Sequence, residues 1–188
     1  MQARRMNGVL KAGMALVLMS CASLHAFAAD AAAPGTKAEP PSAYPLSEVE
    51  ISLRRTGCFG TCPVYEVTID GDGRVVYKGE RFVVVEGEQE GNVEQEQVVA
   101  LLQELYRNYF FDLRDSYRSQ PVLVVKDGEV ILDGAGITDL PSRILRVRIG
   151  DYEKTVTNYL GGPPGLDALF RRVDEVAGTE RWVGPEPQ

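Results

Sequence analysis

The sequence predicts an α+β fold in which a mostly antiparallel sheet of about six to eight strands carries two amphipathic helices on one face. Short segments that alternate apolar and polar residues are joined by tight turns, which favours antiparallel strand pairing. Two longer segments instead repeat apolar residues every three or four positions, as helices with one buried face do. Each of these helices needs a surface to cover, and one face of the sheet supplies it.

Strict alternation predicts a β-meander at the start of the domain. The predicted strands are residues 49–53, 65–69, 74–78 and 82–85. Asp70 to Gly73 predicts a hairpin turn, because its glycines tolerate a positive φ. Gly79-Glu80 predicts a second turn, between the third strand and the fourth.

An amphipathic helix is predicted over about residues 93–108. Asn92 is placed as its N-cap, with Gln95 three residues later in the position of a capping box. The apolar residues at helical spacing are Val98, Leu101, Leu102, Leu105 and Tyr109. The aromatic residues that follow, up to Tyr117, are interpreted as a hook packed against the sheet, with a sugar-stacking platform as the alternative.

The second half of the domain repeats the pattern of strands and then a helix. Residues 121–132 predict a hairpin around Asp127-Gly128, a pair that favours a type I′ turn. Further strands are predicted at 145–149 and 152–159, after a turn at 138–141. The segment Gly161 to Pro164 is predicted to break the strand and start a last helix, with proline in its first turn. This helix ends at the expected cap Gly178, after which Trp182 folds back onto the core.

The N-terminus has the features of an export signal over residues 1–28. Basic residues precede an apolar run, and Ala26-Phe27-Ala28 fits an A-x-A cleavage site. A second interpretation stays open, because Leu18 to Cys21 resembles the lipobox of bacterial lipoproteins, in which Cys21 becomes lipidated. Both interpretations place the mature protein outside the cytoplasm, in the periplasm or lipid-anchored to the outer membrane. The membrane is then a partner only through such an anchor.

The remaining chain divides into a flexible linker, a folded domain and a tail. Residues 29–45 are rich in Ala, Pro, Gly, Ser and Thr and predict the linker. Residues 46–184 are expected to form a single α+β domain, and 185–188 a short tail. Loss of residues 1–28 removes three basic and no acidic residues, so the formal net charge changes from −7 to −10. Such an acidic domain repels phosphate backbones, and nucleic acid is not an expected partner.

The position of the single histidine limits which catalytic and metal-binding functions are possible. The single histidine, His25, lies within the predicted signal. Cleavage after Ala28 leaves a mature chain without histidine, which excludes Ser-His-Asp and Cys-His catalysis and every histidine-ligated metal site. No cofactor is predicted.

Cys58 and Cys62 predict a structural disulfide. In an extended chain their Cα atoms would lie roughly 13 Å apart, so a turn through Gly57 and Gly60 must bring them together. An oxidising compartment would then favour the bond. Three alternatives stay open: a redox-active pair, Cu(I) binding by two thiolates, and inert free thiols. The C-x-x-x-C-P spacing resembles copper-delivery proteins of the thioredoxin fold, but those need a distal histidine.

The chain also resembles a family of uncharacterised bacterial exported domains with a C-x-G-x-C-P-x-Y motif, over roughly residues 49–182. The residues that carry the resemblance are Arg54, 58–65, the 71–79 hairpin, Phe111, 138–141 and 180–182. The family is a domain of unknown function, so the resemblance implies no catalytic residue, substrate or cofactor. The hairpin at 122–133 departs from the pattern, because it is longer than the family would imply.

These observations lead to the hypothesis of an exported, non-enzymatic binding or structural module of the cell envelope, stabilised by the disulfide. The alternative is a thiol-redox or Cu(I)-handling protein that uses Cys58 and Cys62. A binding surface for an envelope partner or ligand is placed at Arg54, Arg55, Tyr65 and Asp139. For the two arginines, ion pairs within the fold are the competing role.

Overall fold

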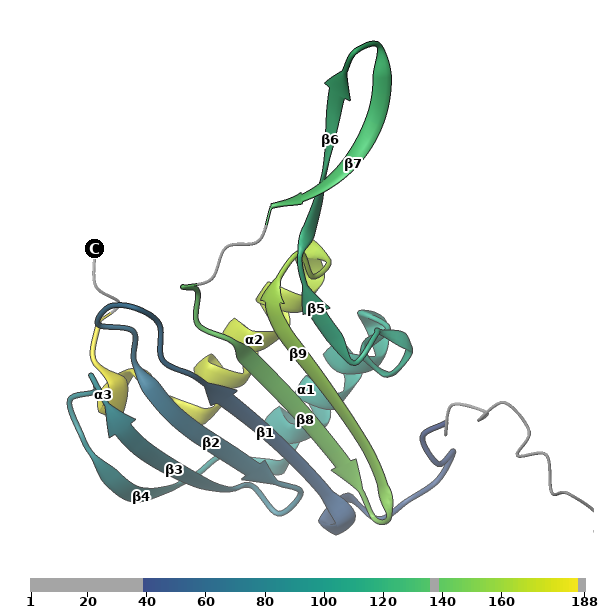
Figure 1. Cartoon of the computed structure of the whole chain (residues 1–188). Helices are drawn as coiled ribbons and strands as arrows, with labels where there is room; N and C mark the ends of the chain where they lie inside the picture. Colours follow the sequence, from purple (N-terminus) through teal and green to yellow (C-terminus); the bar gives the residue numbers. More distant parts are fainter. Residues whose placement is uncertain (1–38, 136–138, 186–188) are drawn as a thin grey trace, which may run out of the picture. The chain divides into compact units, whose positions relative to one another are not determined.

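The computed structural model describes residues 39–135 and 139–185 (Figure 1). The predicted signal with Cys21 and His25, residues 29–38 of the predicted linker, Thr138 of the predicted turn and residues 186–188 lie outside the described residues. Within the described ranges, no helix is long and apolar enough to cross a membrane.

The chain is an α+β protein with a seven-stranded sheet, a two-stranded sheet and few helices. The elements are η1 (Leu46–Glu48), β1 (Val49–Arg55), β2 (Val64–Asp70), β3 (Arg74–Arg81), β4 (Gly87–Asn92), α1 (Gln95–Arg107), η2 (Phe110–Asp112), β5 (Ser116–Arg118), β6 (Gln120–Lys126), β7 (Glu129–Ala135), β8 (Arg143–Ile149), β9 (Tyr152–Leu160), α2 (Pro164–Ala177) and α3 (Glu180–Val183). The larger sheet has the order β4-β3-β2-β1-β8-β9-β5. Every neighbouring pair in it is antiparallel except β5 and β9, so the predicted class and sheet type are confirmed.

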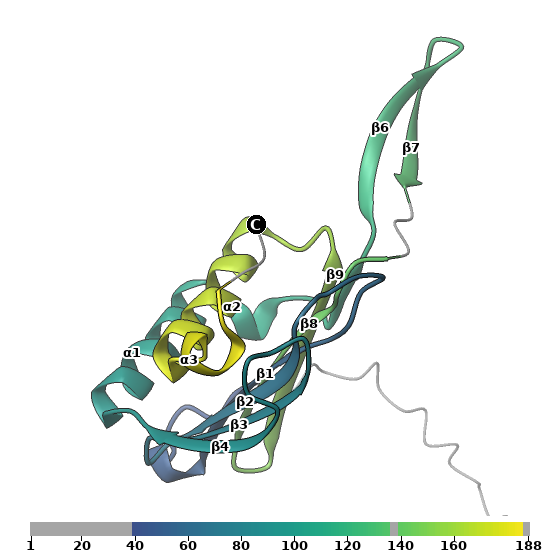
Figure 2. The ribbon, with the colours of Figure 1, turned by 90° about the vertical axis from the view of Figure 1, so that its left-hand side faces the viewer.

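The core lies on the alternating apolar positions of the central strands. Leu53 on β1 opposes Val67 on β2 and Leu145 on β8, and all three side chains are fully buried. The helices add apolar residues to this core: Val98, Leu101, Leu102 and Leu105 of α1, and Leu166, Leu169, Phe170, Val173, Val176 and Ala177 of α2. Helices α1 and α2 lie side by side (Figure 2), and α2 also contacts β1 and β2.

The predicted fourth strand at 82–85 is wrong, and so is the turn at Gly79-Glu80. β3 continues through both residues to Arg81, and the next strand is β4. Phe82 has a φ of 55°, which breaks the strand, and the amides of Val84 and Val85 donate to the carbonyls of Val183 and Trp182. β4 has the sequence GEQEGN, which carries no apolar alternation because this edge strand is largely solvent-exposed.

The first helix begins two residues later than predicted. Asn92 is the last residue of β4, and the N-cap of α1 is Glu94. The backbone N–H of Glu94 donates to the side chain of Gln97 at 3.1 Å, so the reciprocal contact expected of Gln95 is made by Gln97. After α1, Phe110, Phe111 and Tyr117 are buried, whereas Tyr109 is exposed.

The hairpin around Asp127-Gly128 is confirmed. Asp127 and Gly128 have φ values of 53° and 84°, and positive values at both positions are what a type I′ turn requires. β6 and β7 pair only with each other among the described strands, as a separate two-stranded sheet (Figure 1). The sequence indicated a hairpin longer than the family would imply, but did not predict its separation from the larger sheet.

The C-terminal predictions are also confirmed. Pro164 is the first residue of α2, and Gly178 caps its end with a φ of 64°. Trp182 on α3 is buried, and its ring stacks on Tyr77 of β3 with centroids 5.0 Å apart. α3 therefore attaches the end of the chain to the β3 side of the sheet.

Candidate functional site: the disulfide loop and the pocket beside it

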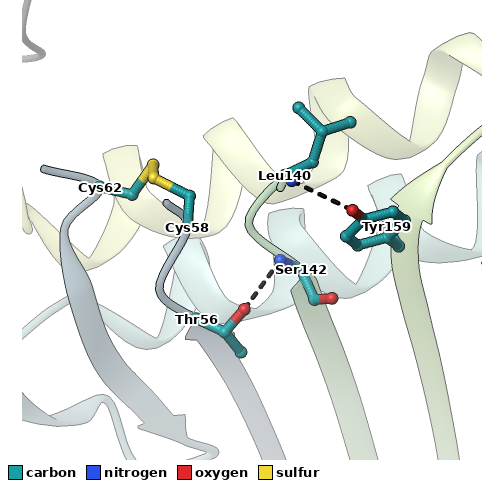
Figure 3. Close-up of a disulfide and its surroundings, with 6 residues drawn as sticks. All are labelled: Thr56, Cys58, Cys62, Leu140, Ser142 and Tyr159. Atoms are coloured by element: carbon teal, nitrogen blue, oxygen red, sulfur yellow. Dashed lines mark hydrogen bonds between the residues drawn. A yellow bond between two sulfur atoms is a disulfide. The ribbon is translucent and has the colours of Figure 1, made fainter. Parts of the chain in front are cut away.

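Cys58 and Cys62 form a disulfide in the loop between β1 and β2, with their Cα atoms 5.7 Å apart (Figure 3). The predicted disulfide is therefore confirmed. The loop follows a strand and leads into a strand, so neither cysteine lies at the start of a helix. The low thiol pKa of a thioredoxin-type pair depends in part on such a helix start.

Hydrogen bonds hold the disulfide loop to the segment that precedes β8 (Figure 3). The Thr56 amide donates to the Ser142 carbonyl at 3.0 Å, and the Ser142 amide donates to the Thr56 hydroxyl oxygen at 2.8 Å. The Leu140 amide donates to the hydroxyl oxygen of Tyr159 at 3.1 Å. The loop is thus constrained both by its own covalent bond and by contacts with residues more than 80 positions away.

Phe59 lies within the disulfide-closed loop and is 92% exposed. Its amide donates to the Asp139 carbonyl at 3.5 Å, while its ring stays in solvent. An aromatic residue of this size usually buries most of its surface. A fixed backbone that holds a phenyl ring in water is therefore a candidate contact point.

A row of polar residues crosses the sheet, and their side chains leave the same face of the strands as the core residues. Arg55 follows Ile51 and Leu53 at alternate positions on β1, so its side chain leaves the same face of the strand as theirs. Arg55 opposes Tyr65 on β2 and Arg143 on β8, and Arg143 opposes Asn158 on β9. The core-facing side of the sheet therefore ends in four polar side chains.

Asp174 of α2 binds the first part of this row. Its carboxylate accepts hydrogen bonds from the Arg55 guanidinium at 2.5 and 3.1 Å, from the Tyr65 hydroxyl at 2.7 Å and from the Thr179 hydroxyl at 2.9 Å. The Arg55 and Asp174 side chains are only 20% and 15% exposed. A carboxylate with this many charge-assisted partners is strongly held in place.

Burial and charge also perturb the groups around Asp174. Burial alone would lower the pKa of Arg55, but the charge of Asp174 reverses the effect and raises it. Burial, followed by the Asp174 charge, raises the pKa of Tyr65 far above its usual value. The arginine therefore stays charged and the phenol stays protonated at neutral pH.

Asp167, two helical turns before Asp174, binds the second part of the row. It accepts from the Arg143 guanidinium at 3.1 Å and from the Asn158 amide at 3.1 Å. The Arg143 guanidinium also lies 5.3 Å from the centre of the Phe170 ring. The two aspartates thus fasten α2 to the polar end of the sheet.

A pocket of about 640 Å³ opens over the Asp174 end of this row. Its polar lining comprises Arg55, Tyr65, Arg143, Arg171, Asp174, Glu175, Thr179 and Glu180, and its apolar lining includes Pro63, Pro141, Val183 and Pro185. Cys62 also lines it, so the disulfide forms part of its wall. Arg55 and Arg143 are engaged in ion pairs, whereas Arg171 is exposed and makes no ion pair with any residue the structure describes.

The four residues predicted as a binding surface do not come together. Arg55 and Tyr65 line the pocket. Arg54 leaves the other face of β1 and pairs with Glu66 at 3.2 Å and Glu80 at 2.8 Å. Asp139 is exposed beside the disulfide loop and does not line the pocket.

Sequence reasoning missed Asp174, Arg143, Arg171 and Thr179. A signal was present for Asp174, because it and Asp167 are seven positions apart and lie among the apolar residues of α2. Acidic residues on the apolar side of a helix require cations on the surface it covers. Arg55, in phase with Ile51 and Leu53, is such a cation.

No group of three or more histidine, cysteine or acidic side chains within residues 39–135 and 139–185 is arranged to hold a metal ion. The pocket instead offers one exposed guanidinium, two exposed carboxylates and apolar walls.

The family model described as "Domain of unknown function (DUF6438)" matches residues 49–177. The chain belongs to this family. The matched DUF6438 region begins at the first residue of β1 and ends at the last residue of α2, so it includes the disulfide and Asp174. α3 and Thr179, which complete the pocket, follow the match. No curated protein matches the chain.

Within this DUF6438 domain the polar groups at the Asp174 end of the pocket are held in place by one another. The Asp174 carboxylate, which is largely buried, accepts hydrogen bonds from three side chains, and burial with the Asp174 charge raises the pKa of the Tyr65 phenol. A binding site needs only a fixed shape with a few polar groups, which this pocket has.

Proposed function

We propose that this DUF6438 domain is an exported, non-enzymatic module that binds a peptide segment of an envelope partner. The binding surface, named here the loop–pocket surface, consists of Phe59, Pro63, Arg171 and Val183. The observation that carries the proposal is the exposed Phe59 ring, held by a disulfide-closed loop beside a pocket. A segment with one apolar and one acidic side chain would fit this surface.

The first support comes from the energetics of Phe59. Aromatic residues dominate the binding energy of many interfaces. The cost of binding includes the loss of loop and side-chain freedom, and this cost falls when the loop is already ordered. The disulfide and the contacts with residues 139–142 fix the Phe59 backbone in advance.

The second support comes from the pocket. Its volume lies within the roughly 300–1,000 Å³ of known ligand sites. Proline and valine walls supply apolar surface without mobile side chains. Arg171 has no ion-pair partner among the described residues, so an acidic group of the ligand would meet a guanidinium that is not yet engaged.

The sequence supports the location and the partner class. The features of residues 1–28 favour export to the periplasm, or lipid anchoring to the outer membrane through Cys21. The negative net charge disfavours nucleic acid as the partner. We also propose that α1 and α2 cover one face of the larger sheet, because both helices contribute to the single core that the alternating strand residues form.

A peptide library displayed on phage tests the proposal with the purified protein as bait. We expect enriched peptides that combine an aromatic or aliphatic residue with Asp or Glu. In fluorescence titrations, Phe59→Ala and Arg171→Ala should each weaken the best peptide at least about 10-fold, the loss typical of a hot-spot truncation. Arg107→Ala is the matched control, because Arg107 is an exposed helical arginine outside the pocket.

Two outcomes would overturn the proposal. One is a library that yields the same peptides with wild type and with the Phe59→Ala/Arg171→Ala double variant. The other is a peptide whose affinity falls as much with Arg107→Ala as with Arg171→Ala, because binding would then follow net charge and not the pocket.

A further inference from the structure

The β6–β7 hairpin carries an apolar surface that the described part of the chain leaves uncovered. Cross-strand pairing joins Leu123 to Leu132 and Val125 to Val130. These four side chains alternate along their strands, so they share one face of the hairpin, named here the hairpin apolar face. They are 68%, 70%, 72% and 69% exposed in that order.

A hairpin of this kind is incomplete by itself. Two strands alone are at best marginally stable in water, and a third strand or a second layer is needed for independent stability. β6 and β7 have no other strand partner among residues 39–135 and 139–185. The apolar side chains have a high preference for strands but gain little from this one pairing.

Natural monomers protect such surfaces with charges, prolines or bulges. The hairpin apolar face has no charged residue within its four positions. Lys126 and Glu129 oppose each other at the turn end, on the other face of the hairpin. Protection by charge is therefore absent from these four positions.

We infer that the hairpin apolar face packs against the same face of a second copy of this chain. The first reason is charge. The chain has a formal net charge of −7, so two copies repel each other wherever acidic surfaces meet. The hairpin apolar face lets two copies meet without bringing like charges together.

The second reason is symmetry and area. A two-fold contact places identical patches against each other. The two cross-strand pairs of one copy can therefore cover the same two pairs of the other copy. Burying eight such side chains at roughly 70 Å² each removes on the order of 600 Å² of apolar surface from water. This apolar area is smaller than the total area of a standard specific interface, so the dimer is weak, reversible and concentration-dependent.

A lipid bilayer is the rival occupant, and the turn argues against it. Lys126, Asp127 and Glu129 surround the tip, so entry into a membrane would carry three charged side chains into hydrocarbon. A face lying flat on an anionic surface would be opposed by the net negative charge of the chain.

Sedimentation equilibrium of the chain, purified as the cell processes it, tests the inference over roughly 1–500 μM. We expect a monomer–dimer equilibrium in wild type. Leu123→Thr/Leu132→Thr keeps a strand-compatible pair but removes half of the apolar face, and should raise the dissociation constant at least about 100-fold. Val124→Thr/Ile131→Thr is the matched control, because this cross-strand pair lies on the other face, and should change it less than about 3-fold.

Three other outcomes would overturn the inferred dimer. A wild-type monomer at all concentrations, or equal weakening by both double variants, overturns the inference. So does flotation of wild type, but not of Leu123→Thr/Leu132→Thr, with phosphatidylglycerol-containing vesicles in the absence of a dimer. Any association through the N-terminus is common to all variants and therefore does not affect their comparison.

Discussion

The central strands of the larger sheet and the β6–β7 hairpin have similar compositions and opposite environments. Ile51 and Leu53 on β1 are fully buried, whereas Leu123 and Leu132 of the hairpin are more than two-thirds exposed. The difference between the two regions is in the pattern. β1 alternates apolar and polar residues, while Val122 to Val125 form an unbroken apolar run. Such runs are typical of strands covered on both faces, which shows that strand composition specifies pairing but not the layer that covers it.

The largest expected effect is a direct test of this contrast. Leu53→Ala should destabilise the fold by about 2–5 kcal/mol, because it opens a cavity between β2 and β8. Leu123→Ala in the hairpin should change the free energy of unfolding by less than about 0.5 kcal/mol at a concentration where the chain is monomeric. Urea unfolding followed by the fluorescence of Trp182 measures both. Equal losses would mean that the hairpin is part of the cooperative core.

The next effect concerns the polar end of the sheet. Asp174→Ala leaves the Arg55 guanidinium without its counter-ion and the Tyr65 hydroxyl without its acceptor. Because these side chains are largely buried, the loss should be about 2–3 kcal/mol. Glu88→Ala is the control, since Glu88 pairs with Lys78 in solvent and should contribute less than about 0.5 kcal/mol. A loss below 1 kcal/mol for Asp174→Ala would show that the network adds no net stability.

The disulfide is expected to contribute less than the Asp174 network. A bond that closes five residues restricts the unfolded chain little, and its removal should cost about 2 kcal/mol. Cys58→Ser/Cys62→Ser should therefore fold, with a lower urea midpoint and weaker peptide binding through Phe59. If a mild glutathione potential reduces the bond, as free-thiol titration would show, and neither stability nor binding changes on reduction, the structural role is contradicted.

The smallest effect is a pH dependence. Above pH about 10 the unfolded chain loses the Tyr65 proton, whereas the folded chain keeps it because burial and Asp174 raise the pKa of Tyr65. Stability should therefore fall with rising pH, by about 1 kcal/mol for this residue at pH 11. Tyr65→Phe should make the decline from pH 9 to 11 shallower, whereas Tyr109→Phe, at an exposed tyrosine, should leave it unchanged. A parallel decline in all three proteins would contradict this assignment.

Sequence patterns correctly predicted the strands, turns and caps that depend on interactions between neighbouring residues. The strict alternation around Ile51, the Asp127-Gly128 turn and the glycine cap at Gly178 each depend on neighbouring residues, and the structure confirms them. β4 could not be predicted in this way, because its polar sequence is a strand only by virtue of pairing with β3. The predicted strand at 82–85 failed for the complementary reason, since the amides of Val84 and Val85 bind α3.

The candidate site was only partly predictable, because its contacts join distant parts of the chain. Arg55 and Asp174 are 119 residues apart in sequence, and no local signal pairs them. The alternation that places Arg55 with the core residues could have indicated a buried ion pair, but not its partner. Phe59 was visible only as one residue of a motif, and its exposure follows from the way the disulfide folds the loop.

The central position of β1 has a consequence for the order of folding. β1 is the first strand made, yet one of its two neighbours is β8, and Arg55 pairs across the ladder with Arg143. During synthesis, one of the two edges of β1 therefore stays unpaired until β8 has been made, about three quarters of the way along this sequence. Such distant pairing slows folding, because the loop must close before the contact is gained. Asp174 arrives later still, so the ion pair that it forms with Arg55 joins the first strand of the larger sheet to its last long helix.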